Sequence, residues 1–464
     1  MIKELRRALG DESKTPRYIE SVYGRGYRLI APVHSGNGAS EPRPSRPEPG
    51  AWSAGEERPA LVLVSAFEDE AVRDRHPHCA AGLREEVLSG LARFREIQLV
   101  ADSRGEEEAG ADHGRAGKRE YQLTATLLPE GDGIKVVARA KRLADRRIVW
   151  AETMSLADTG TAGGVEKIVR RIVGAALPAV DEDVLLGLPQ ESGDFYDNYL
   201  IAKRRSFTAR GYDEARGAAR ALEKLIAARS DFALAYPPLV RLYNTDFGYT
   251  GLGSTGAKER AHALMLAKAG LAADRGNVHA YTVLAFCHLW HGERELARRC
   301  FEQALTLNPY NHVRLQEVAT GWMYMGELAE AEALMERAGE LNRVPDDGFY
   351  EDFGRLRLIE GNYEAAHAML DPILAGTIWA DLFLALCELH LGIGNGARRM
   401  VDWRARVEKG WQAPFPPTSA AIGDWVKRHH PLPADTGQRF FTDVENALGV
   451  GEAAPARLEM PAPR

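Results

Sequence analysis

The chain has 464 residues, with 59 lysines and arginines against 66 aspartates and glutamates, so its formal net charge is −7. This length predicts two to four domains, and the charge excludes attraction of the whole molecule to nucleic acid or an anionic membrane, although a local basic patch stays compatible with either. Four scattered cysteines (Cys79, Cys287, Cys300 and Cys387) predict no disulfide framework, and no segment approaches the roughly 18–20 apolar residues of a membrane helix, so we expect a cytoplasmic protein.

The N-terminal segment, 1–34, predicts a helix followed by a hairpin. Apolar residues from Ile2 to Leu9 share one helix face, and the helix is expected to end at Gly10. Two β-prone runs, 18–22 and 27–30, are joined across a Gly-Arg-Gly tip at 24–26. Through residue 28 the segment has seven basic residues against four acidic ones. This local excess is what a surface facing phosphates requires.

This segment resembles the end of the winged-helix effector domain of OmpR/PhoB-type transcription regulators. The resemblance rests on Ile2-x-x-Leu5-Arg6-x-x-Leu9-Gly10-Asp11 and Pro16-Arg17-Tyr18-Ile19-x-x-Val22-x-Gly24-x-Gly26-Tyr27-Arg28-Leu29. It implies DNA contacts by six basic residues, with Arg25 at the tip of the wing: Lys3, Arg6, Arg7, Arg17, Arg25 and Arg28. The first part of that domain is missing before Met1. We therefore expect either a true start upstream of Met1 or a DNA-binding part that has been lost.

Residues 35–58 are rich in Gly, Ser, Pro and Glu and predict a flexible linker. Residues 59–185 predict a small α/β sandwich in the order β-α-β-β-β-β-α, with strands at 61–64, 97–100, 121–128, 134–142 and 148–153 and helices at 80–94 and 165–177. The region resembles the N-terminal domain of TolB and its regulator-fused relatives, on Leu61-Val62-Leu63 with Phe67, the Gly82-Leu83-x-x-Glu86-x-x-x-x-Leu91 helix and Val149-Trp150-Ala151-Glu152. The resemblance implies no catalytic set.

Several groups of potential ligands occur, and a structural role is favoured for each. His76-Pro77-His78-Cys79 offers three ligands, but a structural zinc site needs four and no second pair accompanies them. Cys287 with His291, and Cys387 with His390, are expected to fill buried helix positions. The glycine-rich run 392–396 lacks the Lys and Ser/Thr of a phosphate loop. We expect no metal site and no cofactor.

From Asn277 onward the sequence repeats itself at a fixed period of about 34 residues. The matched pairs are Ala297 and Ala331, Ala304 and Ala338, Gly292 and Gly326, and Leu284 and Val318. This period is typical of helix-turn-helix arrays, in which stacked units share one core. The units resemble tetratricopeptide repeats. The range 192–430 predicts five or six units, of which three are clear, and 431–464 predict a capping segment followed by a disordered tail.

The first helix of each unit is expected to line a concave face that binds a partner. The repeat register places six residues there: Phe286, Trp290, Gln316, Thr320, Tyr324 and Arg355. The alternative is that Phe286 and Trp290 pack against an adjacent helix, which a shift of one residue in the register would produce.

The predicted fold class is therefore multidomain and mainly α: a truncated winged-helix segment (1–34), a linker (35–58), a small α/β sandwich and an α-helical tetratricopeptide solenoid. One functional hypothesis is a DNA-binding transcription regulator with a tetratricopeptide sensor or interaction arm. The alternative is a tetratricopeptide interaction scaffold that no longer binds DNA. Both expect a protein or peptide partner and no membrane association, and both allow a homodimer. We expect no enzyme, because no nucleophile, kinase or cyclase motif appears.

Overall fold

The computed structural model describes residues 19–22, 26–29, 59–101, 119–156, 162–189, 194–209, 211–246, 252, 256–342, 345–374 and 376–450. The chain divides into two compact units, Met1–Ala54 and Gly55–Arg464. In the first unit, strands β1 (Ile19–Val22) and β2 (Gly26–Leu29) pair antiparallel, with Val22 opposite Gly26. The two β-prone runs of the sequence thus form the predicted hairpin. The predicted helix before it lies outside the described residues.

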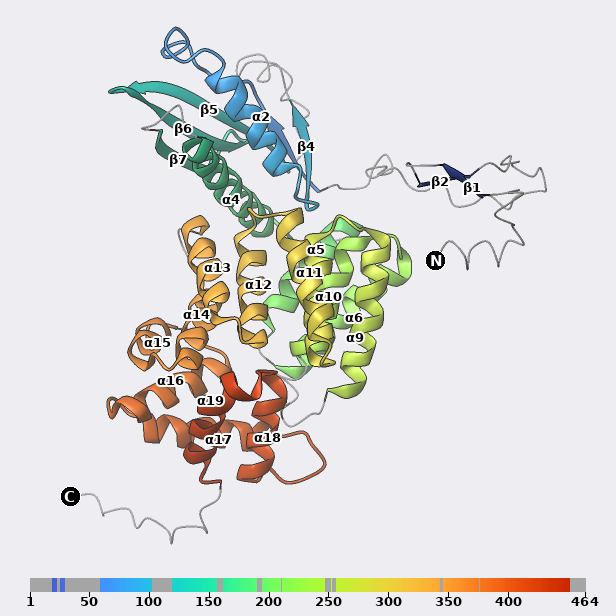
Figure 1. Ribbon diagram of the computed structural model, residues 1–464, viewed down its shortest axis with the longest axis vertical. Helices are drawn as coiled ribbons and strands as arrows, with labels where there is room; N and C mark the ends of the chain where they lie inside the picture. Colours follow the sequence, from blue (N-terminus) through green and yellow to red (C-terminus); the bar gives the residue numbers. More distant parts are fainter. Residues whose placement is uncertain are drawn as a thin grey trace. The chain divides into compact units, whose positions relative to one another are not determined.

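The second unit begins with a five-stranded mixed sheet in the order β4-β3-β5-β6-β7. Strand β3 is parallel to both β4 and β5, whereas β5, β6 and β7 are successive antiparallel neighbours. The bounds are β3 (Ala60–Val64), α2 (Cys79–Leu91), β4 (Ile97–Ala101), β5 (Glu120–Glu130), β6 (Gly133–Arg142), β7 (Ile148–Leu156) and α4 (Ala162–Leu186). Among the elements in the described segments of 59–186, the predicted order β-α-β-β-β-β-α is confirmed (Figure 1).

Helix α4 is longer than the sequence predicted, because it continues past Leu177 to Leu186 and contains Pro178. Its extension is held by packing and by charge. Val180 and Val184 are buried, and Asp183 accepts hydrogen bonds from Tyr121 Oη at 2.8 Å and from an Arg142 guanidinium nitrogen at 2.9 Å. Tertiary contacts of this kind outweigh the local helix-breaking tendency of one proline.

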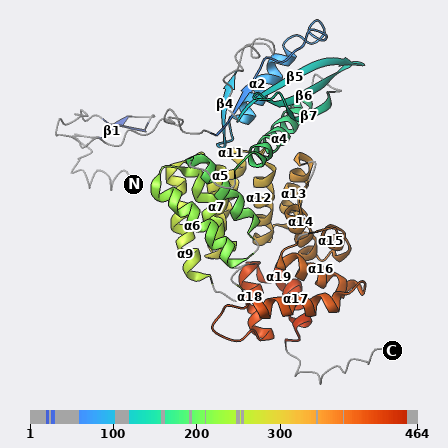
Figure 2. The same cartoon turned by 180° about the vertical axis from the view of Figure 1, so that it is seen from behind.

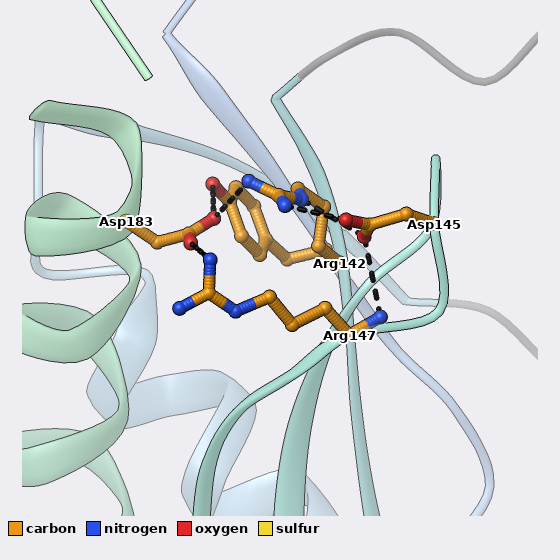
Figure 3. A network of polar contacts seen from close by, with 5 residues as sticks. Arg142, Asp145, Arg147 and Asp183 are labelled. Carbon is orange, nitrogen blue, oxygen red and sulfur yellow. Dashed lines mark hydrogen bonds and ion pairs between the residues drawn. The ribbon is translucent and has the colours of Figure 1, made fainter. Parts of the chain in front are cut away.

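Figure 3 shows this polar network at the ends of β6 and α4. Arg142 lies between two carboxylates: Asp183 on one side and, on the other, Asp145, which it contacts at 2.5 Å. Arg147 approaches Asp183 at 3.6 Å from the loop after β6. The neighbouring Arg142 guanidinium lowers the pKa of Asp145 to about 2. The network ties the end of α4 to the sheet.

After the sheet, helices follow one another as antiparallel pairs (Figures 1 and 2). The pairs are α5 (Phe195–Thr208) with α6 (Tyr212–Ala228), α7 (Tyr236–Arg241) with α9 (Ala257–Ala273), α10 (Val278–Trp290) with α11 (Arg294–Leu307), α12 (His312–Met325) with α13 (Leu328–Leu341), α14 (Asp347–Glu360) with α15 (Tyr363–Leu370), and α16 (Ile378–Leu391) with α17 (Gly396–Gly410). A short 3-10 turn, η2 (Ala233–Ala235), precedes α7, and a π-helical turn, η3 (Leu242–Asp246), follows it. The predicted helix-turn-helix array is confirmed, and it is a helical, tetratricopeptide-like array.

The repeated small residues explain why the helices stack. Ala297, Ala304, Ala331 and Ala338 are all buried to 1 % exposure or less. Gly326 ends α12 with a φ of 89°, a backbone conformation that a side chain would strain. At Gly321 an added Cβ would lie 2.2 Å from the ring of Phe301, so this glycine is what allows α12 to contact α11 closely. The period of the sequence is thus the period of helix-to-helix contact.

A last pair, α18 (Ser419–His429) and α19 (Ala434–Leu448), covers the end of the array. Both views place it beside α14, α16 and α17 (Figures 1 and 2), and α19 contacts α14 and α16. Trp425 on α18 stacks on Trp379 of α16 with ring centroids 4.6 Å apart, and both rings are fully buried. The sequence places a helical cap with a proline-rich break in this part of the chain, and α18 and α19 follow the prolines of 414–417. Residues 451–464, which include the predicted tail, lie outside the described residues.

Candidate functional site

A cavity of about 770 Å³ opens along the array. Its walls come from the first helices of successive pairs, chiefly α10, α12 and α14, with contributions from α5, α7, η3 and the N-cap of α16. The first helices share this wall because each pair repeats the same rotation relative to its predecessor. The cavity is therefore a product of the stacking.

One wall is aromatic. Phe286 and Trp290 lie one turn apart on α10 with ring centroids 6.0 Å apart, and Tyr324 of α12 meets the Trp290 ring edge to face at 5.6 Å. The Trp290 indole N–H donates to the backbone oxygen of Arg428 at 3.1 Å. Arg260 lies over the same indole at 5.6 Å. These contacts hold the aromatic wall in place.

A second wall is polar and is built by α12 and α14. Gln316 Nε2 donates to Asp352 Oδ2 at 2.8 Å, and Arg355 contacts Asp352 Oδ1 at 2.5 Å. Arg355 also lies over the Tyr324 ring at 5.3 Å. A single carboxylate thus orients an amide and a guanidinium at the junction of two repeats.

Two carboxyl groups of this wall are shielded from water. Burial raises the pKa of Glu351 to about 7, although Thr377 Oγ1 donates to its Oε1 at 2.8 Å. Burial also raises the pKa of Glu317, although Arg314 contacts it at 2.5 Å. His312 has its pKa lowered by burial and is neutral near pH 7. The cavity lining holds five acidic residues against two arginines: Glu317, Asp346, Asp347, Glu351 and Asp352 against Arg241 and Arg355.

All six residues that the sequence placed on the concave face line this one cavity: Phe286, Trp290, Gln316, Thr320, Tyr324 and Arg355. Phe286 and Trp290 also pack on neighbouring helices, and Phe286 meets the buried Phe301 ring at 5.2 Å. The structure therefore contains both arrangements considered from the sequence, because Phe286 and Trp290 line the cavity and also pack against neighbouring helices. Whether these residues bind a partner stays a prediction.

Sequence reasoning missed several lining residues, among them Arg241, Asn244, Glu317 and Glu351. A signal for two of them was present. Val283, Glu317 and Glu351 occupy the same position in three successive repeats, and all three line the cavity. Applying the period to every lining position would have found the two glutamates. No sequence signal pointed to Asn244, because it lies in an irregular turn.

The candidate DNA-binding residues stand apart from this site in the sequence. Lys3, Arg6, Arg7, Arg17 and Arg25 lie outside the described residues. Arg28 is in β2, where its backbone is opposite Glu20 of β1. DNA binding by these residues stays a prediction.

Within the described segments, one group of three potential metal ligands lies within 4.8 Å: His367, Asp371 and Glu388. Glu388 already accepts from Arg399 Nε at 3.0 Å and from the Asn395 N–H at 3.1 Å, so its charge is compensated by protein groups. The run His76 to Cys79 does not form such a group, and Cys79 begins α2. Cys287 is fully buried, as expected for a packing residue.

Comparison with family models and with curated proteins finds no match. Among solved structures, the chain is similar to a thermophilic tetratricopeptide repeat protein of Thermus thermophilus, with 18% identity over 41% of this chain and 99% of that chain and a TM-score of 0.32. It is also similar to a tetratricopeptide repeat protein from Parabacteroides merdae (12% identity, 57% and 96% coverage, TM-score 0.34). The chain is also similar to the APC/C hetero-tetramer Cut9–Hcn1, with 11% identity over 63% of this chain and 54% of that chain and a TM-score of 0.37. The winged-helix and TolB-like assignments stay predictions.

No helix among the described residues is long and apolar enough to cross a membrane.

Proposed function

We propose that this chain is a protein-interaction scaffold whose cavity binds an extended segment of a partner protein. One observation carries the proposal: equivalent repeat positions on α10, α12 and α14 converge on a single cavity of about 770 Å³ with an aromatic wall and a polar wall. Aromatic anchors beside oriented polar groups are the composition of peptide-binding grooves. The role is binding without a chemical step.

The experiment selects random dodecapeptides displayed on phage against the immobilised full chain and measures the selected peptides by fluorescence polarisation. Trp290→Ala is expected to weaken binding about tenfold or more, because a half-buried tryptophan in a groove is a typical hot spot. Leu296→Ala is the matched control, since Leu296 is exposed on α11 and does not line the cavity.

A second substitution covers the case in which Trp290→Ala disturbs folding. Val313 is exposed and lines the cavity, so Val313→Trp fills the groove from its rim with little demand on the core. Selected peptides that bind equally well to wild type, Trp290→Ala and Val313→Trp would place the binding surface elsewhere. A selection that yields no binding peptide would also overturn the proposal.

We also propose DNA binding as a second function, carried by the β1–β2 hairpin. The strands that flank Arg25 pair antiparallel, with Val22 opposite Gly26, and the resemblance puts Arg25 at the tip of the wing. The full chain is expected to bind duplex DNA at low salt, with an affinity that falls as salt rises because counterions are released. Arg25→Glu with Arg28→Glu should abolish this binding. An absence of binding at low salt, or binding unchanged by the double substitution, would contradict the proposal.

A further inference from the structure

Asn244 and Thr320 line the cavity and have buried polar side-chain atoms with no hydrogen-bond partner within the part of the chain that the structure describes. Asn244 is 2 % exposed, and neither its Nδ2 nor its Oδ1 is bonded. Thr320 is 7 % exposed, and its Oγ1 is unbonded. A buried polar group without a partner destabilises the fold. Both side chains line the same cavity, which indicates that an occupant supplies the missing bonds.

The backbone around Asn244 holds this amide in place. The residue lies in the π-helical turn η3. Such turns are rare in proteins, and those that occur are often at functional sites. Its carbonyl oxygen accepts from Arg260 Nε at 3.2 Å, which helps to hold the turn in place. A side-chain amide offers donors and an acceptor, and this pair matches the C=O and N–H of a peptide group.

The part of the cavity lining that α14 contributes is acidic. Glu351 is 9 % exposed and accepts from Thr377 Oγ1 at 2.8 Å, and Arg355 on the same helix contacts Asp352 at 2.5 Å. Asp346 and Asp347 lie at the start of the same helix, and Asp346 caps it by accepting from the Phe349 N–H at 2.9 Å. A cationic group entering here would compensate a buried carboxylate, and a carboxylate entering here would be repelled.

We propose that the cavity recognises an extended peptide segment that carries a lysine or arginine. Asn244 and Thr320 bind main-chain groups of the segment, and its basic side chain lies against Glu351 and the start of α14. This inference rests on the proposed function and adds the chemistry of the ligand to it. The buried amide favours a peptide over an apolar occupant, and the surplus of carboxylates in the lining favours a basic segment over an acidic one.

The probe is a set of three oriented libraries of acetylated, fluorescein-labelled nonapeptides. Their central residue is arginine, citrulline or glutamate, and the other positions are random. Retention on the immobilised full chain is measured at pH 8, where Glu351 is ionised. The arginine library is expected to be retained about tenfold more than the citrulline library, which has the same shape without the charge. The glutamate library should be retained least.

Two variants separate the two contacts. Glu351→Gln should bring the retention of the arginine library down to that of the citrulline library. Glu336→Gln is its control, because Glu336 is exposed on α13 and outside the cavity. Asn244→Leu should lower the retention of all three libraries while leaving the unfolding midpoint unchanged or higher, since the amide it removes has no internal partner.

The outcomes also distinguish this inference from the proposed function. Retention that depends on Trp290 but not on the central charge or on Glu351 overturns the inference and leaves the scaffold role intact. Retention unchanged by Asn244→Leu overturns the main-chain contact. If the wild-type chain retains none of the libraries, both the inference and the proposed function fail. A cavity that binds a small molecule would give that result.

Discussion

Replacing Phe301 by alanine is expected to lower the free energy of unfolding of the array by about 3–5 kcal/mol, the usual loss for a fully buried phenylalanine. Phe301 lies on α11 with no exposed surface and meets the rings of Phe286 at 5.2 Å and Trp322 at 6.4 Å. It also fills the space beside Gly321. The cavity left by the substitution has rigid helices on both sides, so little of it can collapse. Urea denaturation followed by circular dichroism measures the loss.

The matched control is Leu296→Ala on the same helix, which should change stability by less than about 0.5 kcal/mol because this leucine is 42 % exposed. The contact can also be tested from the other side. Alanine at position 321 would bring a Cβ against the Phe301 ring, and overpacking of this kind costs about 1–3 kcal/mol. Gly217→Ala on α6, where nothing lies within 4 Å of the new Cβ, should instead stabilise by about 0.5–1 kcal/mol. Equal effects at the two glycines would contradict the close contact.

The second large effect is a loss of stability at acidic pH that comes from two buried histidines, His429 and His430. His430 is 1 % exposed, and its ring lies among Trp379 at 4.7 Å, Phe440 at 5.3 Å and Phe383 at 5.7 Å. Its Nδ1–H donates to the carbonyl oxygen of Val426 at 2.9 Å. Burial lowers the pKa of His430 well below 6.5, and it lowers the pKa of His429 to about 3. Both rings are therefore neutral in the folded protein.

These lowered pKa values make the two histidines destabilise the fold as the pH falls. Below pH 6.5 the unfolded chain protonates these histidines and the folded chain does not, so each ring destabilises the fold by about 1.4 kcal/mol per pH unit as the pH falls. Buried carboxyl groups act in the opposite direction. Because the pKa of Glu351 is raised to about 7, it adds stability as the pH falls from 7 towards 4.5. The difference between wild type and a histidine variant isolates the contribution of one ring.

His430→Phe keeps the ring shape and removes the titration. Between pH 6 and pH 4.5 the stability of this variant relative to wild type is expected to rise by about 1.4 kcal/mol per pH unit, and above pH 7.5 the difference should be constant. Urea denaturation at several pH values measures it. His291→Gln is the control, because His291 lies exposed at the end of α10. A difference between His430→Phe and wild type that does not change with pH would show that His430 is not held neutral.

The sequence alone was sufficient for the repeat array and for the order of the sheet region. A regular period with alanine and glycine at fixed positions reports helix-to-helix contact directly, since only small side chains allow the close approach that Gly321 and Phe301 show. Two short apolar runs likewise predicted β3 and β4, and three alternating runs predicted β5, β6 and β7. For the same reason the register placed six residues together, and all of them line one cavity.

Only the tertiary structure decided features that depend on contacts between distant segments. The continuation of α4 through Pro178 depends on Asp183 reaching Arg142 and Tyr121 in the sheet, which no local pattern encodes. The burial of Glu351 depends on Thr377, which caps a helix of the next pair. Asn244 acquires its unbonded amide from a turn whose geometry is set by Arg260 on α9. Periodicity in the sequence reports which face of a helix is buried, whereas the polarity and shape of a cavity arise from several helices meeting, and this is why the array was predictable and the chemistry of its cavity was not.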